Sequence, residues 1–383
     1  MSDAHDQPEP DRLTGAPHPR MTPHLFGHAD AQADFLDVFN SHRLHHGWLI
    51  TGPRGVGKAT LAWRIARFLL ANPPDDGGLF GAPPKSETLD LPDDHPVMHR
   101  TRALSEPGLF LLRRGGSGST DSLREKNWND GKFAAEILVS QVRKLNGFFS
   151  LSAADGGRRV VIIDAADEMN IQSANAILKM LEEPPARTTL LMIAHQPSRL
   201  LPTIRSRCRE LRLHSLGADD LNNALQQAGA KPAENPAALA ELASGSVGDA
   251  FRLSNLDGMK IYAELVGLYN SLPNLDRARA QSLAQAAAMR GGEEKLDLML
   301  ALNDLLLARL ARTGALGQPP QVEAAAGESD MLTRLSPNPH KARAWANTAQ
   351  AISARVTHAR AVNLDPAALV LDTVFKLQNT AAG

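Results

Sequence analysis

The sequence is poor in cysteine, with Cys208 alone among 383 residues. A single thiol cannot form a disulfide within the chain, nor supply a zinc site built from several cysteines. Long apolar runs are missing as well. No stretch reaches about 18 consecutive apolar residues, the length that predicts a membrane-spanning helix. The first 23 residues are polar and proline-rich and lack the apolar centre of a signal peptide. We therefore expect a cytoplasmic protein with no membrane contact, no metal site and no zinc.

An excess of positive charge is also absent. Lys and Arg total 41 against 42 Asp and Glu, which gives a formal net charge of -1. No global field would draw the chain onto nucleic acid, so any DNA contact must be local or shared with partners. Hydrophobic residues make up 43% and charged residues 22%, as in globular proteins, and 383 residues suggest two or three domains.

A phosphate-binding loop is the strongest motif in the sequence. A short apolar segment ending at Thr51 is followed by a glycine-rich turn and a helical pattern. In such loops backbone N–H groups hold phosphate at a helix N-terminus, and a lysine reaches the outer phosphates. The predicted nucleotide-binding residues are Gly52, Pro53, Arg54, Gly55, Val56, Gly57, Lys58, Ala59 and Thr60.

The loop departs from the active motif at Ala59, where a Ser or Thr hydroxyl normally ligates magnesium. Thr60 cannot replace it, because one step along a helix turns the side chain by about 100° and moves it about 1.5 Å along the axis. We expect that the loop can bind ATP but hydrolyses it inefficiently.

The pattern around the loop predicts a parallel α/β domain over residues 23–215. Buried strands are expected at 48–50, 159–164 and 189–194, each alternating with helices. Asp164 ends the second of these strands, is expected beside the phosphate loop, and is the tenth predicted nucleotide-binding residue. Residues 1–22 are predicted to be a disordered tail, and residues 72–132 a loop-rich insertion with little structure of its own.

The remainder of the chain shows only helical patterns. Residues 216–255 carry three short ones, which predict a small helical lid. Residues 256–383 are rich in alanine and leucine with longer helical periods, which predict an all-helical C-terminal domain.

Four elements together resemble the AAA+ clamp-loader subunits of the bacterial replicative DNA polymerase. They are the phosphate loop, the strand ending in Asp164, Leu-Glu-Glu-Pro-Pro at 181–185, and Ser-Arg-Cys at 206–208. The resemblance covers about residues 23–255 by motif. It implies an AAA+ domain, a helical lid, and a C-terminal collar that assembles subunits into a ring. Relatives often hold zinc through four cysteines in the insertion, and this chain lacks them.

Within that family the chain resembles the delta-prime branch more than the ATP-hydrolysing gamma or tau branch. Ala165 follows Asp164 where the active relatives have a glutamate that polarises water. Gly248 stands where they carry an arginine, and Ala194 or His195 where they carry a threonine. Efficient phosphoryl transfer depends on positioned metal, water and cations. The resemblance therefore implies little or no ATPase activity in this chain, which would serve as one part of a DNA-directed DNA polymerase holoenzyme.

Arg207 matches the arginine finger that a clamp-loader subunit extends into the ATP site of its neighbour. By resemblance it is the catalytic residue that acts in trans. The implied partners are gamma or tau and delta subunits in a hetero-oligomeric ring, and through them the sliding clamp and primer-template DNA. The alternatives are an active ATPase of the gamma or tau type and, less in keeping with the helical lid and collar, a phosphate-loop kinase acting on a small molecule.

Overall fold

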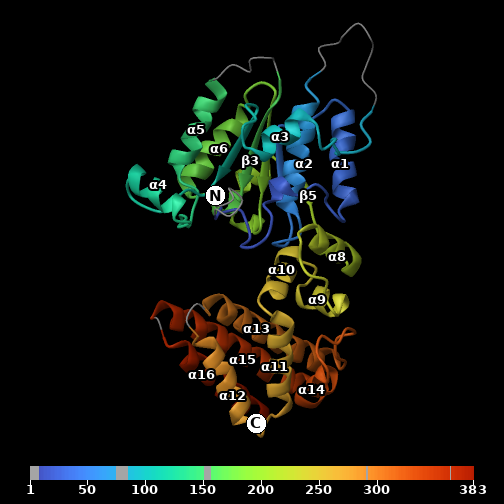
Figure 1. The fold of residues 1–383 in the computed structure, drawn as a ribbon, viewed down its shortest axis with the longest axis vertical. Helices are drawn as coiled ribbons and strands as arrows, with labels where there is room; N and C mark the ends of the chain where they lie inside the picture. The colour runs from blue at the N-terminus through green and yellow to red at the C-terminus, as the bar shows by residue number, and fades with distance from the viewer. Residues whose placement is uncertain (1–7, 75–84, 151–156, 290–291, 363) are drawn as a thin grey trace. The chain divides into compact units, whose positions relative to one another are not determined.

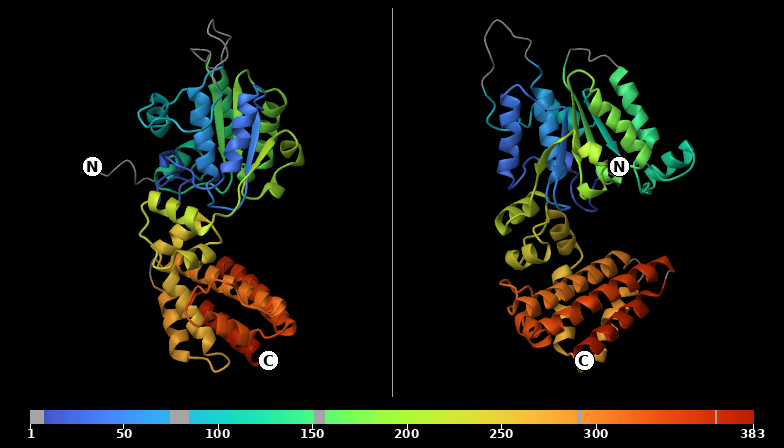
Figure 2. Two further views of the ribbon diagram at one scale, coloured as in Figure 1. Left: turned by 90° about the vertical axis from the view of Figure 1, so that its right-hand side faces the viewer. Right: turned by 180° about the vertical axis from the view of Figure 1, so that it is seen from behind.

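The computed structural model describes residues 8–74, 85–150, 157–289, 292–362 and 364–383. They form two compact units, residues 1–229 with 246–248 and residues 230–245 with 249–383. None of the helices in these described ranges has the length and apolar character needed to cross a membrane. Figures 1 and 2 show the strands and helices of each unit.

The first unit is built on one five-stranded sheet. All of its pairings are parallel, and the strand order is β2-β3-β4-β1-β5. This confirms the predicted parallel α/β fold. The strands are β1 Gly47–Thr51, β2 Leu109–Arg113, β3 Arg159–Asp164, β4 Thr188–Ile193 and β5 Arg209–Arg212.

Helices cover both faces of this sheet, as the alternation of side chains along β1 shows. Trp48 and Ile50 pack in the apolar cluster under α1 and α2, whereas Leu49 packs in the cluster under α5 and α6. Figure 1 shows the two helix layers on opposite sides of the strands. The helices of this unit are η1 Pro19–Met21, α1 Ala29–Asn40, α2 Lys58–Ala71, α3 Pro96–Arg102, α4 Asp121–Asn129, α5 Val139–Ser150, η2 Ala166–Glu168, α6 Ile171–Glu182, η3 Pro197–Arg199, α7 Pro202–Arg205 and α8 Ala218–Gln227.

Helix α6 shows how sequence sets an element's bounds. Asn170 caps its start, with the side-chain oxygen accepting from the backbone N–H of Ser173 at 2.9 Å. Its apolar residues recur on one face, where Ile177 and Leu181 are buried. The two prolines at 184 and 185 prevent its continuation, and the helix ends at Glu182.

The second unit is entirely helical in its described residues, as the sequence predicted. Its longest helices, α13 and α15, pack along one another, and α12 packs against α16 (Figure 2). The helices are α9 Pro236–Leu242, α10 Val247–Asn255, α11 Gly258–Asn270, α12 Arg277–Ala287, α13 Glu293–Leu316, α14 Glu328–Leu335, α15 Pro339–Ala361 and α16 Pro366–Ala382. Helix α10 begins with residues that belong to the first unit. The separate lid of residues 216–255 and collar of residues 256–383 stay predictions.

Two segments differ from the sequence prediction. The insertion 72–132 contains α3, α4 and β2, and β2 completes the sheet through four buried or half-buried apolar residues at 109–112. The predicted tail 1–22 is also ordered over residues 8–22, where ion pairs fasten it to the sheet domain. The sequence did not predict these structures, because turn-forming residues surround both segments. Residues 1–7 and 75–84 lie outside the described residues.

Candidate functional site

The phosphate loop connects β1 to α2, as its sequence requires. Gly52, Gly55 and Gly57 have φ values of 134°, 76° and 107°, a region that side chains with a Cβ rarely adopt. A Cβ on Gly52 would lie 2.3 Å from the backbone oxygen of Leu213. The loop therefore has the backbone shape that glycine alone permits, at the carboxyl end of β1.

The Lys58 amine forms hydrogen bonds within this loop. Lys58 is 3% exposed, and its Nζ donates to the backbone carbonyls of Gly52, at 2.8 Å, and Pro53. Burial lowers the pKa of Lys58 to about 8, and the nearby acidic groups Asp164 and Asp167 act in the opposite direction. The group that would reach a nucleotide's outer phosphates is thus engaged with its own loop.

Other parts of the same unit lie against the loop. Gly248 donates its backbone N–H to the carbonyl of Gly55 at 3.2 Å, and a Cβ on Gly55 would lie 2.3 Å from Ser246 Oγ. On the other side the His28 ring contacts the Val56 carbonyl at 2.9 Å. Arg54 at the tip is exposed, whereas Ala59 is partly buried against the apolar cluster below α2. Sequence reasoning did not predict these contacts.

Asp164 lies at the end of β3, in register with Arg113 of β2. Burial raises the pKa of Asp164 to about 8, and the nearby carboxylates of Asp11 and Glu168 act in the same direction. Lys58 and Arg113 oppose this rise. Burial therefore disfavours the ionised carboxylate of Asp164, which is the form that holds magnesium.

The residues after Asp164 have structural partners. Asp167 accepts hydrogen bonds from the backbone N–H groups of His195 and Gln196, both at 3.0 Å, and so fixes the end of β4. Glu168 pairs with Arg114 at 2.9 Å. Burial and the Lys58 charge lower the pKa of His195 to about 4, so the imidazole is neutral. Asp167 and Glu168 are thus both engaged by other groups of this chain.

An ion-pair network joins the N-terminal segment to this edge of the sheet. Arg113 pairs with Glu9 at 2.6 Å and with Asp11, and Arg20 pairs with Glu9 at 2.7 Å. The His18 ring contacts Asp11 at 3.1 Å. Glu9, Asp11 and His18 could hold a metal ion by their spacing, since their ligand atoms lie within 4.8 Å of one another. The two arginines already neutralise these carboxylates, so the cluster is an ion-pair anchor.

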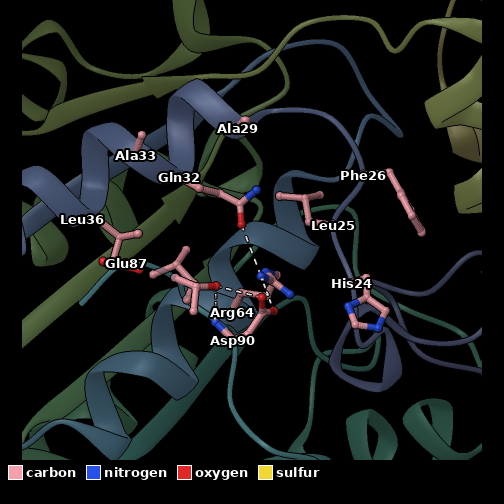
Figure 3. Close-up of a pocket in the computed structure, with 12 residues that line it drawn as sticks. His24, Leu25, Phe26, Ala29, Gln32, Ala33, Leu36, Arg64, Glu87 and Asp90 are labelled. Atoms are coloured by element: carbon pink, nitrogen blue, oxygen red, sulfur yellow. Dashed lines mark hydrogen bonds and ion pairs between the residues drawn. The ribbon is translucent and has the colours of Figure 1, made fainter. Parts of the chain in front are cut away.

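A cavity of about 460 Å³ lies between α1, α2 and the segment after residue 84 (Figure 3). Arg64 lines it and contacts the Pro23 carbonyl at 2.8 Å, Gln32 at 3.3 Å and Asp90 at 2.7 Å. The Arg64 guanidinium in this cavity is thus already paired with a carboxylate of the chain, that of Asp90. The cavity lies apart from Lys58 and Asp164, neither of which lines it.

Arg207 and the phosphate loop lie at opposite ends of two neighbouring strands, β5 and β1. Arg207 precedes β5, whose first residue Arg209 pairs in register with Trp48 at the start of β1. The loop follows the end of β1, and four strand residues span about 13 Å. Arg207 is therefore remote from Lys58 of its own chain. Its guanidinium contacts Glu182 at 2.9 Å and the Thr203 carbonyl at 3.1 Å, and its side chain is 37% exposed.

The comparison with known protein families identifies the chain. A family model described as DNA polymerase III, delta subunit, matches residues 27–217. The chain belongs to the delta-prime clamp-loader subunit family. It is 37% identical to DNA polymerase III subunit delta′ of Pseudomonas aeruginosa over 216 residues, which cover 56% of this chain and 57% of the relative. It is 28% identical to subunit delta′ of Bacillus subtilis over 268 residues, 69% of this chain and 70% of that protein.

Proteins named as tau or gamma subunits are also similar to this chain. DNA polymerase III subunit tau of Escherichia coli is 27% identical over 275 residues, which cover 67% of this chain and 36% of tau. Among solved structures, a gamma subunit-related protein of Thermotoga maritima aligns over 91% of this chain and all of its own, with 15% identity and a TM-score of 0.36. That score is low, and the family assignment rests on the family model and the curated relatives.

Proposed function

We propose that this clamp-loader subunit is the stator of its ring, which supports ATP-driven loading of the sliding clamp during replication and supplies Arg207 to a neighbouring ATPase. One observation carries the proposal: the arginine precedes β5 and the phosphate loop follows β1, so the two lie at opposite ends of neighbouring parallel strands. In a ring of similar subunits packed in one orientation, such an arginine faces the nucleotide of the next subunit and not its own.

The phosphate loop of this chain supports the part of the proposal in which the chain does not hydrolyse ATP efficiently itself. Position 59 has no hydroxyl for magnesium, and position 165 no carboxylate for water. The Lys58 amine donates to Gly52 and Pro53. ATP entering the loop would have to break these bonds and displace Ser246 and Gly248 from Gly55. ATP therefore binds weakly here and is not efficiently hydrolysed.

The relatives' names and this geometry support the proposed partners. Gamma or tau subunits would provide the ATP site that Arg207 completes, and delta would close the ring. The helical second unit is the part proposed to join the ring. The clamp and primer-template DNA would be reached through the assembly, in keeping with the net charge of -1. The alternative, an active gamma- or tau-type ATPase, requires the loop to open and Asp164 to ionise.

A reconstitution experiment tests the stator role. Clamp loading onto primed DNA is measured with the ATPase and delta subunits of the same organism, with and without this chain. The proposal expects loading only when the chain is present, and loading by a Lys58→Ala variant at the unchanged rate. Full loading without the chain, or loss of loading with a Lys58→Ala variant that still folds and enters the ring, would support a different function.

A further inference from the structure

Glu182 is the one carboxylate in contact with Arg207 in the described part of the chain. Its Oε1 lies 2.9 Å from Arg207 Nη2, and the same guanidinium donates through Nη1 to the Thr203 carbonyl at 3.1 Å. Glu182 is the last residue of α6, and Thr203 lies in α7. Two N–H groups of the guanidinium are therefore engaged by the chain itself, one of them with a full negative charge.

The backbone beneath this ion pair is held firmly. Ile204 is fully buried, and the carbonyl of Arg207 lies 3.3 Å from the position that a Cβ on Gly47 would take. The His46 ring contacts the carbonyl of Leu181 at 2.9 Å, which ties the end of α6 to the start of β1. The chain thus fixes where the Arg207 and Glu182 side chains begin, and only their tips are free to exchange partners.

The tips themselves are open to solvent. The Glu182 side chain is 50% exposed and that of Arg207 37% exposed. An ion pair with this exposure is weak and readily exchanged. A phosphate group carries more negative charge than a carboxylate and accepts two parallel N–H bonds from a guanidinium. A phosphate brought close to Arg207 would therefore displace the carboxylate.

From this geometry we propose that Glu182 is a latch that occupies Arg207 until a neighbour's nucleotide takes its place. The inference rests on the trans-acting role of Arg207. Before the ring closes, Glu182 masks the arginine's charge. When a neighbour's γ-phosphate arrives, Glu182 must separate from Arg207, because a carboxylate left beside a phosphate is repelled by it. Glu182 is thus a positioning residue that weakens engagement of the finger and makes it depend on bound nucleotide.

Substitution of Glu182 by glutamine keeps the side chain's shape and removes its charge. In the reconstituted loader, Glu182→Gln is expected to lower the ATP concentration for half-maximal DNA-stimulated turnover by roughly two- to fivefold, the range that an exposed ion pair allows. Turnover at saturating ATP stays unchanged. Glu183→Gln is the matched control, since the exposed neighbour carries the same charge, and it is expected to behave as the native chain.

A double variant separates the latch from a structural effect. In an Arg207→Ala background Glu182→Gln should change nothing further, because the latch then has nothing to hold. A Glu182→Gln loader that matches Glu183→Gln, that needs more ATP, or whose change persists without Arg207, would overturn the latch. If Arg207→Ala still lowers turnover in those cases, the stator function stands without it. Unchanged turnover in Arg207→Ala would instead contradict the function on which the latch rests.

Discussion

Lys58 Nζ lies 2.8 Å from the backbone carbonyl of Gly52, so the lysine of the phosphate loop is bound to the loop that it would serve. Its second acceptor is the carbonyl of Pro53. A buried ammonium needs such acceptors, and these two satisfy it without a nucleotide. The lysine is therefore a structural part of the loop as well as a remnant of its chemistry.

The first prediction concerns ATP turnover by the isolated chain. Because the lysine is engaged and no hydroxyl or glutamate completes the site, the native chain and a Lys58→Ala variant should hydrolyse ATP at the same background rate. Steady-state phosphate release measures both. Lys126→Ala, at an exposed lysine of α4, controls for loss of charge. A native rate clearly above that of Lys58→Ala would favour the gamma- or tau-type ATPase.

The second prediction concerns pH and Asp164. Its pKa is about 8 in the folded chain against 3.8 for the ordinary carboxyl, so between about pH 4 and 8 the folded state holds a proton that the unfolded state has lost. This carboxyl therefore costs stability as the pH rises through that window. Asp164→Asn removes the cost, and its gain over the native chain should grow by up to about 1.4 kcal/mol per pH unit.

Denaturant unfolding at pH 5, 6 and 7 measures that gain. Asp93→Asn provides the control, because its side chain is 77% exposed and pairs with Arg102 at the surface. A gain from Asp164→Asn that stays constant across the three pH values would show that Asp164 is ionised in the folded chain. Magnesium binding would then be open to it.

The third prediction concerns the ion-pair anchor of residues 8–22. Arg113→Ala leaves Glu9 and Asp11 without their shared cation, and the Asp11 side chain is only 2% exposed. Breaking one partner out of a buried pair costs about 3–5 kcal/mol. The variant should lower the unfolding free energy by at least part of that range and make the segment accessible to protease. Lys144→Ala, at an exposed residue of α5, should do neither. Equal stability of the two variants would contradict the anchor.

The core of the fold could be predicted from sequence because its signals are local. Continuous apolar runs marked β3 and β4, and glycines followed by Lys58 marked the turn into α2. The sequence did not predict strand β2, because its short run of apolar residues at 109–112 lies between loop-forming segments. These residues form a strand by pairing with β3, which is distant in the sequence. Local patterns do not report such long-range pairing.

For the candidate site, too, some features were predicted from local sequence and others were not. The sequence predicted that Lys58 and Asp164 lie close to one another, and Asp164 does act on the pKa of Lys58. Their role in nucleotide binding stays a prediction. The sequence could not show that Lys58 turns back to Gly52, or that Glu9 and Asp11 approach β2 from about a hundred residues away. These contacts join segments distant in the chain, and each partner alone looks like an ordinary polar residue.

The fourth prediction concerns the helical unit. Glu328 of α14 is fully buried, accepts from Tyr262 at 2.5 Å and pairs with Arg309 at 2.7 Å. Glu328→Leu removes the buried carboxylate beside Arg309, which keeps only its half-exposed partner Glu241 at 2.9 Å, and it leaves the Tyr262 hydroxyl without its acceptor. We expect a loss of about 3–5 kcal/mol in unfolding free energy. The double variant Glu328→Leu with Arg309→Met should recover much of that loss, because an apolar pair of similar volume replaces the ions. Additive losses in calorimetry would show that the two residues act independently.

The central claim is that this clamp-loader subunit contributes catalysis only to its neighbour, through Arg207. DNA-stimulated ATP turnover of the reconstituted loader is the direct measurement, with assembly checked by gel filtration. Arg207→Ala should leave the ring assembled and depress turnover at the adjacent site by about 10³-fold or more, as arginine fingers do elsewhere, while Arg205→Ala leaves turnover unchanged. The other ATPase sites of the loader continue to hydrolyse ATP and would mask this loss. Turnover at the adjacent site is therefore measured in a loader whose other ATPase sites are inactivated. Full turnover in the Arg207→Ala loader would contradict the account.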